Sequence, residues 1–415
     1  MRVLFTVFPA TAHVHPIVPL AWALQNAGHE VRVAIHPDTV HLVTEAGLPA
    51  VPLGSREVLA DAVKWNDNFE MLDSLSDALS LDTDDAPQWE RQWQGLTGML
   101  RMFTPMLDDL VDFCRGWQPD LVVWDPFCVA AGVAARVTGA AHARFLWGQD
   151  NIGWLRATSL KSLGHRAGSA DDPVQALMAP MLERYGLEYS EDLLLGQWTV
   201  DPMPTALRLP LAGRYEPIRR LPYNGSTVAP AWVHERPRRP RVLLTLGIGG
   251  RGRQLFKAAG VSFPEVVDAL AGLDVEVVAT LHRAMLQTVT RVPDNVRLAE
   301  YVPLAQILPS CSAIIHHGGG GTFAAATAAA VPQLIVPMPC WSEATTARFM
   351  ADRGAGLVVT TEEFDTELLR KQMTRLLDEP SFAEGARALR AEINQAPGPA
   401  EFVSVLEALT AEHRA

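Results

Sequence analysis

The chain has 415 residues, 48% of them hydrophobic, and a formal net charge of −12 at pH 7. That length predicts two domains, and the apolar fraction is sufficient for a full core in each. The acidic balance argues against nucleic acid or an anionic membrane surface as a partner.

Cysteine usage and the apolar runs indicate the compartment. Every apolar run is shorter than the roughly 18 residues that a membrane-spanning helix needs. The opening run, Arg2 to Phe8, is interpreted as a strand and not as a signal peptide, because Pro9 interrupts it. The cysteines are scattered without metal-ligand spacing, at Cys114, Cys128, Cys311 and Cys340. This usage is typical of a reducing compartment, so we expect a cytoplasmic protein without structural disulfides.

The first half of the chain predicts one doubly wound α/β domain. After the opening strand, a loop over 11–16, a helix over 17–27 and a strand over 30–35 complete a βαβ unit. The later elements of this half are predicted as a strand over 120–124, a helix over 129–137 and a strand over 142–146.

An acidic excursion over 55–93 interrupts this pattern and carries Trp65, Trp89 and Trp93. We interpret it as a helical excursion with a solvated acidic face; the alternative is a lid or a docking surface. Its Asp82-Thr83-Asp84 run resembles an Asp-x-Asp metal motif. Because it does not follow a strand, we interpret the match as coincidence and expect no metal site.

A proline- and arginine-rich stretch over 229–240 is interpreted as a linker between residues 1–228 and a second α/β series over 241–396. The strands of this series are predicted over 241–246, 274–280, 296–299, 312–315, 333–336 and 356–359. A last amphipathic segment over 401–411 lies in a C-terminal region, 397–415, that we expect to pack back on the N-terminal domain.

The stretch from His316 to Thr322, His-His-Gly-Gly-Gly-Gly-Thr, lies where a predicted strand turns into an Ala-rich helix. Glycines allow the backbone to approach a ligand, and the start of a helix presents free amides and the positive end of its dipole. This combination predicts an anion site, with phosphate as the usual occupant. The motif lacks the Gly-Lys-Ser/Thr ending of a P-loop. The alternative is a tight turn with two structural histidines.

The motif resembles the diphosphate signature of GT-B glycosyltransferases of the UDP-glycosyltransferase superfamily. The chain is most similar to the actinomycete enzymes that transfer TDP-deoxysugars to polyketide aglycones, and the similarity runs nearly end to end. Besides the glycine motif, it is carried by the runs 18–24, 27–33, 119–123, 197–202, 222–225 and 243–247. The resemblance implies an α/β protein of two Rossmann-like domains facing each other across a cleft.

For the carboxy-terminal domain the resemblance implies a nucleotide-sugar donor site. Diphosphate contacts are implied for His317 and Thr322, and the backbone amides of Gly319, Gly320, Gly321 and Thr322 would cradle the anion. Thr245 and Gly247, at the end of the first strand of the domain, are further matching donor positions. Tyr301 and Val302 match the stretch whose backbone contacts the nucleotide base in the family. Either Arg251 or Arg253 could neutralise phosphate charge, or both are solvated. TDP is preferred to UDP only because of the most similar enzymes.

Three residues, Trp341, Ser342 and Glu343, occupy the place where similar enzymes hold the hydroxyl groups of the sugar. Here serine replaces an acid and glutamate replaces glutamine. Fewer matched polar groups suit a deoxygenated sugar, because unpaired buried polar groups are costly. The alternative at Ser342 is ordinary helix N-cap chemistry, and both roles are compatible.

In the amino-terminal domain, the run from Ala12 to Pro16 resembles the Gly-His-x-x-Pro of the family, which makes His13 the matching general base. His15 is a neighbour outside the matched position, and Asp125 could orient the His13 ring. The alternative is a structural histidine. We expect inversion at the anomeric carbon and no metal, because amides and a helix dipole could carry the charge of the leaving diphosphate.

The activity expected is therefore transfer of a deoxysugar to a polyketide, either a macrolide or an aromatic aglycone, in antibiotic biosynthesis. No cofactor is expected, since the TDP-sugar is a co-substrate. The alternatives are a nucleotide-sugar epimerase on the same fold and a non-catalytic helper protein. Relatives suggest a cytochrome-P450-like activator as a partner, for which the acidic excursion is a candidate surface, and a homodimer is left open. Neither the aglycone, the deoxysugar nor O- versus C-glycosylation follows from the residues.

Overall fold

A computed structural model describes residues 1–55, 95–162, 164, 172–247, 255, 259–280, 286, 289, 291–337 and 342–414. The chain forms two compact units. The first contains the described residues up to Arg220 together with those from Ala396 onward, and the second contains those from Leu221 to Gln395. The acidic excursion beyond its first residue, and the candidate donor residues Trp341, Arg251 and Arg253, lie outside the described residues.

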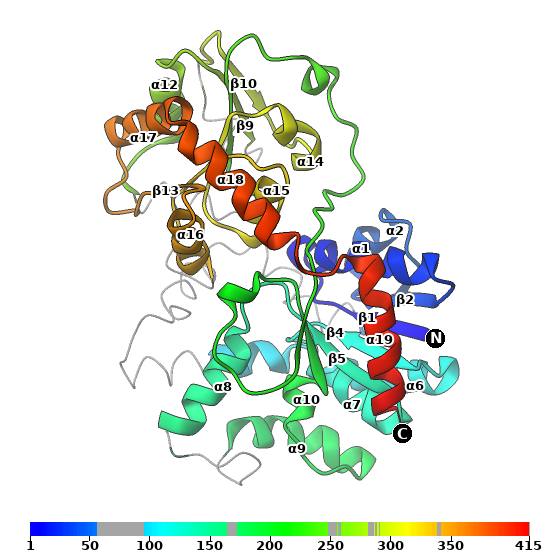
Figure 1. Cartoon of the computed structure of the whole chain (residues 1–415). Coiled ribbons are helices and arrows are strands. Elements are labelled where there is room, and N and C mark those ends of the chain that lie inside the picture. Colours follow the sequence, from blue (N-terminus) through cyan, green and yellow to red (C-terminus); the bar gives the residue numbers. More distant parts are fainter. Residues whose placement is uncertain are drawn as a thin grey trace. The chain divides into compact units, whose positions relative to one another are not determined.

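The first unit contains a seven-stranded sheet with the order β3-β2-β1-β4-β5-β6-β7, in which every pairing is parallel (Figure 1). The strands are β1 (Arg2–Thr6), β2 (Glu30–Ile35), β3 (Ala50–Pro52), β4 (Leu121–Trp124), β5 (Ala141–Phe145), β6 (Trp198–Asp201) and β7 (Tyr215–Pro217). The predictions found β1, β2, β4 and β5 but missed the other three. These are short, and β3 and β7 are only partly buried edge strands, so neither has a hydrophobic run.

Helices cover both faces of this sheet. They are α1 (Thr11–Asn26), α2 (His41–Thr44), α6 (Leu107–Trp117), α7 (Val129–Thr138), α8 (Asn151–Ser162), α9 (Pro173–Tyr185), α10 (Asp192–Leu195) and α19 (Pro399–His413), with short 3-10 turns at Pro37–Thr39, Thr104–Met106 and Thr205–Leu207. Because β2 and β5 lie on opposite sides of the central β1-β4 pair, right-handed crossovers place α1 and α7 on opposite faces.

The loop predicted over 11–16 is wrong, because α1 begins at Thr11 and continues through Pro16 and Pro19. Each proline removes one backbone donor from the helix, which is why Pro16 had marked the predicted boundary. Burial overrides this local cost: Val14, Ile17 and Val18 are at most 2% exposed. Tertiary packing of one face supplies most of the stability of a helix within a protein.

The C-terminal helix α19 belongs to the first unit and packs against α1 (Figure 1). Glu407 of α19 lies 3.1 Å from Nε2 of His29, and the ring of His413 stacks on Trp198 with 5.3 Å between centroids. Just before the helix, the carbonyl of Pro397 accepts a hydrogen bond from the amide of Arg219. The last turns of the chain are therefore anchored to the sheet of the first unit.

The second unit contains a six-stranded parallel sheet with the order β10-β9-β8-β11-β12-β13. Its strands are β8 (Arg241–Thr245), β9 (Glu276–Thr280), β10 (Val296–Ala299), β11 (Ala313–His316), β12 (Gln333–Ile335) and β13 (Gly356–Val358). Its helices are α12 (Phe263–Ala271), α14 (Leu304–Ile307), α15 (Gly320–Ala328), α16 (Glu343–Asp352), α17 (Thr366–Asp378) and α18 (Pro380–Ile393), with 3-10 turns η4 (Ala231–His234) and η5 (Leu308–Ser310). All six predicted strands are present, each within two residues of its predicted limits.

Two apolar cores lie against this sheet, one of which includes residues of α12 and α17 and the other residues of α14 and α15. The second core includes Val233 from η4, although 229–240 was predicted to be a linker. The carbonyl of Val233 accepts a hydrogen bond from Arg241 at the start of β8. The compact units divide between Arg220 and Leu221, so the proline-rich stretch is part of the second unit.

Candidate active site

In the first unit, His13 and Asp125 meet at the carboxyl-end edge of the sheet. His13 lies in the first turn of α1, which follows β1, and Asp125 directly follows β4. The backbone amide of Asp125 donates to the carbonyl of Thr6, the last residue of β1, at 2.8 Å. The His13 Nδ1 and Asp125 Oδ2 atoms are 2.6 Å apart, and both residues are buried.

The carboxylate of Asp125 is held on both sides. Its Oδ1 accepts the backbone amide of Phe127 at 3.0 Å, which leaves Oδ2 for the ring of His13. A neutral imidazole whose Nδ1 donates to a carboxylate has an unprotonated Nε2. The arrangement therefore makes His13 Nε2 a proton acceptor. His15 is on the same helix, half-buried, and is not the histidine that meets Asp125.

Aromatic rings surround the His13 ring. The ring centroids of Phe8 and Trp147 each lie 4.7 Å from it, and that of Phe127 lies 5.9 Å away. Phe8 and Phe127 are fully buried, whereas Trp147 is half-buried. An apolar surround strengthens the hydrogen bond to Asp125 and suits a hydrophobic acceptor.

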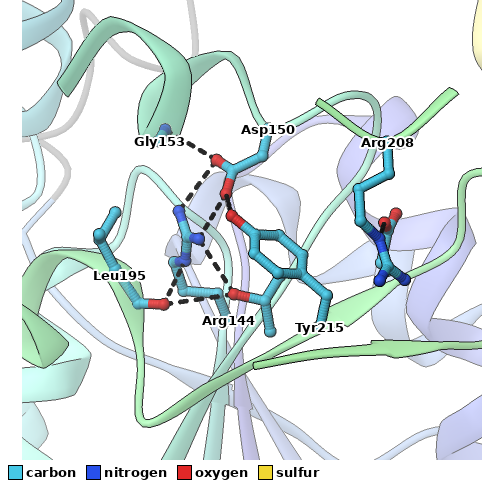
Figure 2. Close-up of polar contacts among 8 residues, drawn as sticks. Arg144, Asp150, Gly153, Leu195, Arg208 and Tyr215 are labelled. Carbon is cyan, nitrogen blue, oxygen red and sulfur yellow. Dashed lines mark hydrogen bonds and ion pairs between the residues drawn. The ribbon is translucent and has the colours of Figure 1, made fainter. Parts of the chain in front are cut away.

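The loop that carries Trp147 lies between Arg144 and Asp150, which form a buried ion pair (Figure 2). Arg144 of β5 makes two hydrogen bonds to Asp150, with Nη1–Oδ1 at 3.0 Å and Nη2–Oδ2 at 2.5 Å. Tyr215 of β7 donates to Asp150 Oδ2 at 2.6 Å, and the amide of Gly153 donates to Oδ1 at 2.9 Å. Burial alone would raise the pKa of Asp150, but the charge and hydrogen bonds of Arg144 outweigh it and lower that pKa.

Two further hydrogen bonds fix the same loop. Arg220 Nη1 donates to the carbonyl of Trp147 at 3.0 Å, and Gln149 Nε2 donates to the carbonyl of Leu207 at 2.6 Å. Together with the Arg144–Asp150 pair, these bonds fix residues 144, 147, 149 and 150. The place of the indole ring beside His13 therefore depends on several segments of the first unit.

In the second unit, the glycine motif begins at the carboxyl end of β11 and continues into α15. The first helical hydrogen bond joins the Phe323 amide to the Gly319 carbonyl, so the amides of Gly320, Gly321 and Thr322 precede the ladder. The Gly319 amide donates to Nδ1 of His317 at 3.1 Å. The amides of Gly320, Gly321 and Thr322 therefore begin the helix outside its hydrogen-bond ladder, whereas the amide of Gly319, predicted to join them in holding the anion, is bonded to His317.

That hydrogen bond also sets the tautomer of His317. Because Nδ1 accepts, the neutral ring has its proton on Nε2 and presents it as a donor. A Cβ atom built on Gly247 would lie 3.3 Å from this Nε2, so the loop after β8 reaches the same place. Gly247 has φ +70 and Gly318 has φ +95, a backbone region that favours glycine. A side chain on Gly318 would meet Ile335 and Glu343.

The remaining candidate donor residues lie along the same sheet edge or in the adjoining core. Thr245, at the end of β8, accepts a hydrogen bond from Thr280 of β9 at 2.7 Å. Ser342 occupies the N-cap position of α16 without a side-chain cap hydrogen bond, and Glu343 is 3% exposed in the first turn. Val302 is buried in the second core of this unit.

Sequence reasoning assigned no role to Asn224, although it lies within the similar run 222–225. Its backbone carbonyl accepts the hydroxyl of Tyr301, and its Oδ1 accepts the amide of Ala305 at 2.8 Å. Asn224 therefore holds the stretch that begins at Tyr301. Trp147 and Thr280 were also missed; the signal that could have found them is position, since each lies at or just beyond the carboxyl end of a predicted strand.

Solved structures match this architecture along its whole length. The glycosyltransferase VinC in complex with dTDP has 37% sequence identity and a TM-score of 0.86, covering 99% of this chain and 100% of that one. The spinosyn forosaminyltransferase SpnP has 39% identity and a TM-score of 0.81, covering 99% of each chain. The two parallel-sheet units are those of a glycosyltransferase of the GT-B fold.

The chain belongs to the erythromycin biosynthesis protein CIII-like family, whose N-terminal domain matches residues 22–247 and whose C-terminal domain matches residues 264–409. It is 44% identical to the aclacinomycin-T 2-deoxy-L-fucose transferase of Streptomyces galilaeus, covering 100% of this chain and 97% of that protein. It is 41% identical to the 10-deoxymethynolide desosaminyltransferase of Streptomyces venezuelae, covering 100% and 98%. The predicted family, fold and enzyme class are confirmed, and neither the epimerase nor the helper protein is supported.

Among the described residues, no helix is both long and apolar enough to span a bilayer. Within the same residues, no three side chains of the His, Cys, Asp and Glu types gather in a way that could hold a metal ion.

Proposed function

We propose that the chain transfers a deoxysugar from a TDP-sugar to a polyketide aglycone in antibiotic biosynthesis. The observation that carries this proposal is the full-length identity of 41–44% to two enzymes named as deoxysugar transferases. One of them is named for an aromatic product and the other for a macrolide precursor, so both aglycone classes stay within the proposal.

The donor is assigned to the second unit. The amides of Gly320 to Thr322, the positive end of α15 and the Nε2–H of His317 supply the donors that a diphosphate requires. Thr245, Gly247 and the backbone of Tyr301 and Val302 would complete the nucleotide site. The sugar is assigned to Ser342 and Glu343, together with Trp341. These groups also stabilise the leaving TDP, so we propose transfer without a metal or another cofactor.

The acceptor is assigned to the first unit, with His13 as the general base. Its Nε2 takes the proton of the aglycone hydroxyl as the oxygen bonds to the anomeric carbon, and the bond from that carbon to the diphosphate breaks. Asp125 holds the ring and stabilises the imidazolium that forms. A single displacement of this kind inverts the anomeric configuration. The surrounding aromatic rings favour a hydrophobic acceptor.

The location and the partners complete the proposal. We place the protein in the cytoplasm, as its cysteine usage predicts. We further propose a cytochrome-P450-like activator and a second copy of the chain as partners. Neutralising the acidic residues of the stretch over 55–93, which lies outside the described residues beyond Ser55, tests the contact with the activator.

The decisive experiment incubates the purified protein with TDP-2-deoxy-L-fucose, and separately with a TDP-aminodeoxysugar, against one aromatic and one macrolactone aglycone. Mass spectrometry should show the aglycone plus one deoxysugar, with TDP released in equal amount, also in the presence of EDTA. A control with a UDP-sugar tests whether the enzyme prefers thymine to uracil as the nucleobase of the donor. Consumption of the donor to free sugar or to an epimer, with no glycoside formed on any aglycone in the presence or absence of an activator, would contradict the proposal.

A further inference from the structure

His316, the first residue of the glycine motif, begins a buried network of three polar side chains that the proposed transfer does not itself use. His316 Nε2 and Gln333 Oε1 are 2.9 Å apart, and Gln333 Nε2 donates to Thr327 Oγ1 at 3.2 Å. All three residues are at most 2% exposed. They come from the end of β11, the start of β12 and the later part of α15. The polar network therefore joins these three elements.

A backbone amide determines which ring nitrogen of His316 carries the proton. The amide of Gly318 donates to Nδ1 of His316 at 3.1 Å, and a ring nitrogen that accepts has no proton. The proton of His316 is therefore on Nε2 and is donated to Gln333, whose NH₂ group then faces Thr327. Burial, followed by the nearby His317, lowers the pKa of His316 to about 3, so the ring is neutral at physiological pH.

Hydrophobic packing does not explain a glutamine at this position. Gln333 lies in a buried parallel strand opposite Ile314 and is followed by Leu334 and Ile335. An apolar residue would suit this strand, and replacing a buried polar set with apolar groups often has little effect on stability. A fully satisfied polar network instead specifies one arrangement of the groups that it joins. Here those groups include Gly318, whose φ of +95 is where β11 turns toward α15.

We propose that Gln333 is a positioning residue for the diphosphate of the donor. It accepts the Nε2–H of His316 and so fixes the orientation of the ring, which keeps Nδ1 hydrogen-bonded to the Gly318 amide. Through Thr327 it also ties α15 to the strand from which the motif emerges. The amides of Gly320 to Thr322 are thereby aimed at the anion before it binds. The inference rests on the proposed function for the class of ligand, a nucleoside diphosphate.

The test measures the Kd for TDP by calorimetry, and the KM for donor and for aglycone, in Gln333→Leu, Thr327→Val and Thr327→Ser. Gln333→Leu should weaken TDP binding at least tenfold and raise the KM for the donor, while the KM for the aglycone changes less than twofold. Thr327→Val, which keeps the shape of the side chain, should show a smaller loss in the same direction. Thr327→Ser keeps the hydroxyl and should restore wild-type affinity.

A matched control separates positioning from loss of stability. Asn295 Nδ2 donates to the carbonyls of Ala271 and Val275, just before β10 and thus at the amino-end edge of the same sheet. Asn295→Ala should lower the melting temperature without changing the Kd for TDP. A Gln333→Leu or Thr327→Val protein that is destabilised like this control yet binds TDP within twofold of wild type would overturn the inference. Should Gln333→Leu fail to fold, the near-isosteric Thr327→Val decides. Failure of the wild-type protein to bind TDP would instead overturn the donor assignment, and with it this inference.

Discussion

The Nδ1 atom of His13 lies 2.6 Å from Oδ2 of Asp125, although 112 positions separate the two residues in the chain. The pair forms because β1 and β4 are hydrogen-bonded neighbours in the sheet, and parallel strands deliver the residues that follow them to one edge. The pairing turns a histidine in the first turn of a helix into a defined tautomer with Nε2 as the acceptor.

Replacement of His13 tests the base. General-base catalysis supplies about 10²–10⁴-fold, so His13→Ala should lower kcat by roughly that factor on an alkyl hydroxyl acceptor. The Kd for TDP should barely change, because the residues proposed to bind the donor belong to the other unit. Asp125→Asn should have an intermediate effect and His15→Ala a milder one. Near-normal kcat in His13→Ala would assign this histidine a structural role.

Replacement of His317 tests the donor site. If His317 donates to the diphosphate as proposed, His317→Ala removes a hydrogen bond to a charged group, which costs about 1.5–3 kcal/mol, or roughly 10- to 150-fold in affinity. Calorimetry should show weaker TDP binding while the circular dichroism spectrum stays that of the wild type. Unchanged affinity in the folded variant would remove His317 from the diphosphate site.

Breaking the ion pair between Arg144 and Asp150 tests how the loop that carries Trp147 is held. Arg144 and Asp150 are 1% and 5% exposed, and removing one partner of a buried pair costs about 3–5 kcal/mol. Asp150→Asn should therefore lower the free energy of unfolding by about that much in denaturant titrations, and should also lower kcat through misplacement of Trp147. The control is Arg184→Ala, which breaks an exposed pair with Asp108 and should cost less than about 1 kcal/mol. Equal losses of unfolding free energy in Asp150→Asn and Arg184→Ala would show that the Arg144–Asp150 pair does not stabilise the loop as proposed.

Asp201 should make the free energy of unfolding depend on pH. Burial raises its pKa to about 6, although hydrogen bonds from Met203 and Arg208 partly oppose the rise. Because the folded state holds the proton more tightly than the unfolded state, this contribution is fully present below about pH 4 and is lost as the pH rises through about 6. The loss is on the order of 2–3 kcal/mol. Asp201→Asn should remove this component, so the difference in unfolding free energy between pH 4.5 and 7 should change by that order. An identical pH dependence in both proteins would reject the assignment.

The structure explains which local predictions succeeded. Strands β1, β4 and β8 are built around buried apolar runs, so their signal is local and was found in the sequence. The loop over 11–16 was predicted wrongly because Pro16 indicated a helix boundary. The buried face that stabilises the helix across this proline exists only in the folded unit. Edge strands such as β7 are held by pairing with a neighbour and have no hydrophobic run of their own.

The sequence by itself determined the two-unit α/β plan, the anion motif at the end of β11 and the histidine that follows β1. The first two depend on hydrophobic runs, glycines and spacing, which are local properties, whereas the histidine was singled out by the resemblance of the run 12–16 to the family motif. Only the tertiary structure decided that His13 meets Asp125, that Trp147 covers the ring, and that the Gly319 amide serves His317. Contacts such as that between His316 and Gln333 join residues that are distant in the chain. They follow from strand order and register, which no single stretch of sequence encodes.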